Sequence, residues 1–110
     1  MRLRVVQGAR RDFIEAVRWY RSSGATNQAR ELVEDYNGTI QYARQFPNAG
    51  SLVVSRRERP FLIRKYLLHS FPYKLIVACF EHELVVLALA HQKRKPDYWM
   101  PRLVKVKPER

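Results

Sequence analysis

The sequence predicts an α+β fold in which a helical hairpin packs on one face of a mainly antiparallel sheet of about four strands. In the first half, apolar residues recur at helical spacing over residues 9–20 and again over residues 29–43. From residue 51 the apolar residues follow strand periodicity, and the uncharged run at residues 84–90 is typical of a buried central strand. Both helices precede the main strands and must therefore cover one face of the sheet.

The first half has recognisable boundaries around its two helices. A short strand is expected over residues 3–7, and Asp12 lies early in the first helix, where a carboxylate suits the positive end of the helix dipole. Gly24 is a plausible left-handed cap for the end of this helix. Thr26 or Asn27 is expected to cap the second helix.

Gly38 interrupts the apolar stripe of the second helix, at a cost of about 1 kcal/mol relative to alanine. We interpret it as a position where the helix approaches a neighbouring element closely. The segment 46–50, which contains Pro47 and Gly50, ends the helix.

The second half reads as a meander of strands. The expected segments are an edge strand at 51–55, a charged turn at 56–60, strands at 61–70, 74–80 and 84–90, and a last helical turn at 97–102. The strand at 61–70 has mixed faces, so part of each face should be covered. We expect one domain over residues 1–103 and a basic tail over residues 104–110.

The charge of the chain favours a polyanionic partner. The 110 residues carry a net charge of +11, and the excess lies in the second half. Residues 55–74 hold six cations against one anion, and residues 91–110 hold seven against two. Nucleic acid, an anionic membrane or an acidic protein could each match this field.

Other features of the sequence limit the classes of protein to which it can belong. No apolar run approaches the ~20 residues that span a bilayer, and the N-terminus lacks a signal-peptide core. Cys79 is the only cysteine, which excludes an intramolecular disulfide. These features predict a cytoplasmic protein.

Few residues remain as candidates for chemistry. The histidines are far apart, so no metal site is expected, and neither a glycine-rich phosphate loop nor a recognised nucleophile context occurs. We therefore expect no cofactor. His91 directly follows the buried strand and precedes Lys93, Arg94 and Lys95, whose charge would favour its neutral, basic form. The alternative is a structural histidine at a strand end.

The other candidates also have two interpretations each. Arg64 lies mid-strand and either reaches the rim or binds an anion. The three cations after His91 could hold phosphates or simply face solvent. Tyr98 and Trp99 could stack on a base or hold the C-terminal segment on the core, and we favour the second interpretation for Trp99.

These residues carry a family resemblance. The order strand, two helices and meander, with Phe71-Pro72-Tyr73-Lys74-Leu75-Ile76 and then the segment from Ala90 to Trp99 followed by Arg102, resembles the RelE/ParE superfamily of type II toxins over about residues 1–102. The Pro96-Asp97-Tyr98-Trp99 ending is most similar to the ParE-like plasmid-stabilisation branch.

The resemblance implies a small basic toxin held inactive by a cognate acidic antitoxin in a hetero-oligomer. ParE-like members block DNA gyrase, and we favour this function. The contact residues would then be Lys93, Arg94, Lys95, Tyr98, Trp99 and Arg102.

RelE-like members cut messenger RNA on the ribosome, and this is the alternative. His91, Arg64, Arg94 and Tyr98 would then be catalytic: His91 or a perturbed Tyr98 as base, and the arginines as stabilisers of the developing charge. A third possibility is a non-toxic nucleic-acid-binding adaptor.

Overall fold

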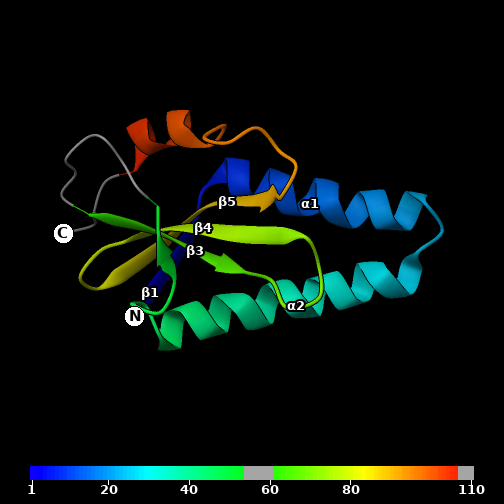
Figure 1. Ribbon diagram of the computed structural model, residues 1–110, viewed down its shortest axis with the longest axis horizontal. Coiled ribbons are helices and arrows are strands. Elements are labelled where there is room, and N and C mark those ends of the chain that lie inside the picture. Colours follow the sequence, from blue (N-terminus) through cyan, green and yellow to red (C-terminus); the bar gives the residue numbers. More distant parts are fainter. Residues whose placement is uncertain (54–60, 107–110) are drawn as a thin grey trace.

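The computed structural model describes residues 1–53 and 61–106 (Figure 1). In chain order the elements are β1 (Arg2–Val5), α1 (Gln7–Ser22), α2 (Thr26–Gln45), β2 (Ser51–Leu52), β3 (Leu62–Leu67), β4 (Tyr73–Cys79), β5 (Glu83–His91) and the 3-10 helix η1 (Met100–Lys105). The α+β class and the helical hairpin are therefore confirmed. The expected charged turn at residues 56–60 lies outside the described residues.

The strands form one sheet in the order β1-β5-β4-β3-β2. Neighbouring strands are antiparallel except β1 and β5, which run parallel with Leu3 opposite Leu84. Over the described residues the sheet has five strands where the sequence predicts about four, since the N-terminal strand β1 and the two-residue edge strand β2 both join the three strands of the meander. The parallel pair places β5 at an interior position of the sheet, where both of its edges are bonded.

The helices α1 and α2 lie side by side on one face of the sheet (Figure 1). Their apolar stripes meet the sheet in a core that includes Leu32, Tyr36, Leu75 and Val86. Phe13 of α1 stacks on Tyr36 of α2, with ring centroids 4.2 Å apart. The helical periodicity of the sequence thus places the apolar side chains that hold the helical hairpin on the sheet.

The opposite face is covered by the C-terminal segment. Trp99, just before η1, is 4% exposed, and Val106, just after η1, is 6% exposed; both belong to one buried cluster with Ile63, Ile76 and Leu87 of the sheet. This second layer explains why the apolar run of β5 has no polar face. Ordered packing continues past residue 103, the domain boundary that the sequence predicts.

Two helix-level predictions are wrong and one is confirmed. Gly24 has φ +79° after α1, as a left-handed cap requires. Neither Thr26 nor Asn27 caps α2, because Ala25 occupies the N-cap position and makes no side-chain hydrogen bond to the helix. Gly38 is exposed and a Cβ there would meet no atom within 4 Å, so no close approach explains it.

No helix in the described part of the chain combines the length and apolarity needed to cross a membrane.

Candidate functional site

A cleft of about 610 Å³ lies between α1 and the C-terminal end of β5. Three of the predicted site residues line it, namely His91, Arg94 and Tyr98. Aromatic side chains form much of the remaining wall, with Trp19 and Tyr20 from α1 and Tyr73 from β4. The buried strand β5 therefore delivers its last residue to the edge of this cleft.

His91 is held by the sheet and by the turn that follows it. It lies opposite Tyr73 in the β4–β5 ladder, and the two rings meet edge to face at 5.1 Å. Its Nδ1 accepts a hydrogen bond of 3.0 Å from the Lys93 backbone N–H, and its carbonyl accepts one of 2.9 Å from the Arg94 N–H. Because Nδ1 is an acceptor here, the neutral ring carries its proton on Nε2.

Tyr98 is fixed by α1. Its hydroxyl donates a hydrogen bond of 3.0 Å to Oδ2 of Asp12, and the Arg94 guanidinium lies over its ring, 4.2 Å from the centroid. Burial, and then the Asp12 carboxylate, raise the pKa of Tyr98 well above its ordinary value. This direction is opposite to the one that a tyrosine base requires, so the phenol stays protonated and acts as a donor.

The Arg102 guanidinium forms its hydrogen bonds within the protein, to Asp12 and to the main chain of β5. Its Nη1 donates to Oδ2 of Asp12 at 2.7 Å and to the Leu87 carbonyl at 2.8 Å, and its Nη2 donates to Oδ1 of Asp12 at 3.2 Å. The hydrogen bonds to Asp12 raise the pKa of Arg102. These contacts, together with the burial of Trp99, give two of the six predicted contact residues, Trp99 and Arg102, a role in attaching the C-terminal segment.

The sequence does not predict that the Asp12 carboxylate joins Tyr98 and Arg102 to α1. The Asp12 side chain is only 8% exposed, and it also accepts a hydrogen bond of 3.2 Å from the Leu89 N–H of β5. The interpretation of Asp12 as a helix-dipole carboxylate is wrong, since no acidic residue lies in the first turn of α1. One signal was present: Asp12 shares a helix face with Ala9 and Ala16, both buried, and a carboxylate on an apolar face needs a partner.

Arg64 does not join the cleft. It extends from β3 and donates a hydrogen bond of 2.7 Å from Nη1 to the Gly50 carbonyl, next to β2. Its Nε is buried and has no hydrogen-bond partner among the residues that the structure describes. The four residues proposed for a ribonuclease are therefore divided, with three at the cleft and Arg64 at another part of the sheet.

The cations that follow His91 face solvent. Lys93, Arg94 and Lys95 are all exposed, on a loop that starts where the Gln92 N–H bonds the Pro72 carbonyl at 2.9 Å. The loop ends at Asp97, whose φ of 67° turns the chain back toward Tyr98. Exposed cations on an anchored loop can contact an anionic surface without prior rearrangement.

Within residues 1–53 and 61–106, no group of three or more histidine, cysteine or acidic side chains is arranged to hold a metal ion.

No protein-family model matches the sequence. No curated protein matches it either. Among the solved structures that it matches is a chain described as "Chromosomal ParDE TA system from P. aeruginosa", with 20% sequence identity and a TM-score of 0.65. The match covers 83% of this chain and 95% of that chain. The fold is RelE/ParE-like. In this RelE/ParE-like fold the cleft and the exposed cations lie together at the C-terminal end of β5.

Proposed function

We propose that this chain is the toxin of a type II toxin–antitoxin system, neutralised by an acidic antitoxin. The observation that carries the proposal is the fold match, which extends over almost the whole of a chain from a ParDE system. The net charge of +11 supports an acidic partner protein, because opposite charge steers and stabilises such complexes. The site of action would be the cytoplasm.

Within this class, we propose that the target is DNA gyrase and that the toxin acts by contact. The exposed loop cations Lys93, Arg94 and Lys95 support a contact surface. The separation of Arg64 from His91 argues against an assembled ribonuclease centre, and so does the protonated state of Tyr98. A contact mechanism requires neither of those groups.

A ribosome-dependent ribonuclease is the second candidate because His91 and Arg94 line one cleft. In that mechanism His91 would accept the proton of a ribose 2′-hydroxyl, and Arg94 would stabilise the charge that develops on the attacked phosphate.

Induced expression tests the toxin proposal. The native chain should arrest growth, and co-expression of its cognate acidic antitoxin should restore it. A variant with Lys93→Glu and Lys95→Glu is the matched control, because both positions are exposed and the fold should persist. Unimpaired growth with soluble native protein would contradict the proposal and favour a nucleic-acid-binding adaptor.

A further inference from the structure

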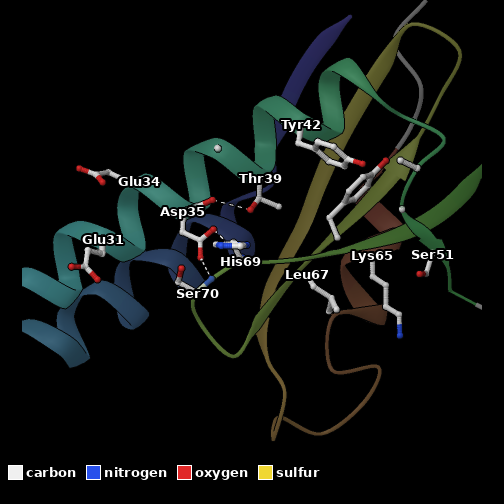
Figure 2. A pocket seen from close by; sticks show the side chains of 14 residues that line it. Glu31, Glu34, Asp35, Thr39, Tyr42, Ser51, Lys65, Leu67, His69 and Ser70 are labelled. Carbon is white, nitrogen blue, oxygen red and sulfur yellow. Dashed lines mark hydrogen bonds between the residues drawn. The ribbon is translucent and has the colours of Figure 1, made fainter.

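A second hollow, separate from the cleft at His91, lies between α2 and β3. Its volume is about 720 Å³, and Figure 2 shows it from close by. Glu31, Glu34 and Asp35 line it from α2, and Lys65 and Leu67 line it from β3 (Figure 2). We call this hollow the α2–β3 groove.

The outer edge of β3 is unpaired at Leu67, as far as the described residues go. The short strand β2 pairs with Arg64 and Lys65 only, and the Val53 N–H bonds the Ile63 carbonyl beyond them. Backbone polar groups alternate sides along a strand, and the Leu68 N–H points inward to the Tyr73 carbonyl. The N–H and carbonyl of Leu67 therefore point outward, toward the groove.

No described residue takes the place of a partner strand at Leu67. The register of β2 would place Ala49 opposite it, but the Ala49 N–H donates to the Phe46 carbonyl instead, at 3.1 Å. The Leu67 side chain is 66% exposed, and Tyr42 on the helix side is 50% exposed. The groove thus offers backbone hydrogen-bonding groups and apolar surface together.

The helix side of the groove is anionic in a strongly cationic chain. Asp35 is already used, since Oδ1 accepts the His69 N–H at 3.0 Å and Oδ2 accepts the Ser70 N–H at 2.7 Å (Figure 2). Glu31 and Glu34 are exposed and form no ion pair with any residue in the described ranges. The carboxylates of Glu31 and Glu34 on the α2 wall of the groove are complementary to a cationic side chain.

We propose that the α2–β3 groove binds an extended segment of a partner protein, which pairs with the main chain of Leu67 at the outer edge of β3 and directs a lysine or arginine toward Glu31 and Glu34. Main-chain hydrogen bonds to Leu67 provide affinity, and the carboxylates provide selectivity. The groove is lined from α2 and the His91 cleft from α1, and the two share no lining residue. The proposal does not depend on the proposed toxin activity.

A displayed library of ten-residue peptides provides the test. The native full-length chain is the bait, and the Leu67→Pro variant, which removes the outward N–H, is the counter-selection. The expected consensus alternates apolar residues and contains at least one lysine or arginine. Binding of the best peptide, measured by fluorescence anisotropy, should weaken at least tenfold on Glu31→Gln/Glu34→Gln. It should be unchanged on Glu81→Gln, an exposed carboxylate on the β4–β5 turn.

Three outcomes would overturn the proposal. The first is a selection with no enrichment over the counter-selected variant. The second is an acidic consensus peptide whose affinity does not change on Glu31→Gln/Glu34→Gln. The third is self-association of the chain that Leu67→Pro abolishes, which would make a second copy the occupant. Circular dichroism of each variant, with native-like spectra expected, separates a lost contact from a lost fold.

Discussion

Arg102 and Asp12, ninety positions apart in the chain, form a two-point ion pair with N–O distances of 2.7 and 3.2 Å. The pair joins η1 to α1 across the end of the sheet, and the Tyr98 hydroxyl donates to the same carboxylate. The loop that carries Lys93, Arg94 and Lys95 lies between β5 and this attachment. Its position therefore depends on contacts far from it in sequence.

Replacing Arg102 should destabilise the protein markedly. Arg102→Met leaves Asp12 as a carboxylate with 8% of its side chain exposed, and removing one partner of a buried pair costs about 3 kcal/mol or more. Urea unfolding measures the change in the free energy of unfolding. Arg18→Met, an exposed position on α1, should change it by less than about 0.5 kcal/mol. Equal stabilities of the two variants would show that the pair contributes nothing.

Two glycine-to-alanine substitutions should change the stability of the protein in opposite directions. A Cβ at Gly8 in α1 would lie 2.5 Å from Nε of Arg102, which is fixed by Asp12, so Gly8→Ala should destabilise the protein. A Cβ at Gly38 meets nothing within 4 Å, so Gly38→Ala should stabilise α2 by about 0.5–1 kcal/mol. Thermal unfolding of the two variants and of the native protein measures both changes in stability. A stabilising Gly8→Ala would mean that Arg102 moves away at no cost.

Stability should fall as the pH rises above about 10. Burial raises the pKa of Tyr98, and of Tyr36, Tyr66 and Tyr73, above the ordinary value of 10.0. The unfolded chain therefore releases these protons at lower pH than the folded chain does, and the stabilisation is complete below pH 10 and lost above it. Unfolding free energies between pH 8 and 11.5 measure the slope, which Tyr98→Phe should reduce. An unchanged slope in Tyr98→Phe would contradict the assignment for that residue.

Charge reversal in the loop should remove toxicity, whereas loss of His91 should not. Lys93→Glu/Lys95→Glu replaces two exposed cations of the proposed contact surface, and growth arrest should be lost. His91→Ala should leave growth arrest within about tenfold of native in inducer dose, because a contact mechanism needs no base. Arg18→Glu/Arg30→Glu, at exposed cations on α1 and α2, makes the same change in net charge and is the control. Loss of toxicity in His91→Ala alone, with the fold intact, would favour the ribonuclease.

The sequence predicts those parts of the molecule that depend on local periodicity. The helical stripes and the run at residues 84–90 lead directly to α1, α2 and β5, and Gly24 caps α1 as expected. Helical periodicity places Asp12 on the apolar face of α1, which indicates that its carboxylate needs a partner. It does not indicate that the partner is Arg102, because a pair so distant in sequence leaves no periodic signal. The same limit applies to Arg64, whose partner, the Gly50 carbonyl, is a backbone group.

A supercoiling assay with purified DNA gyrase tests the central claim most directly. The account predicts that the native chain inhibits supercoiling, or traps double-strand breaks, at saturating concentration. The Lys93→Glu/Lys95→Glu variant should do neither, and ribosome-bound message should remain intact in parallel reactions. Normal supercoiling in the presence of saturating, folded native protein, together with cleavage of the message, would contradict the claim.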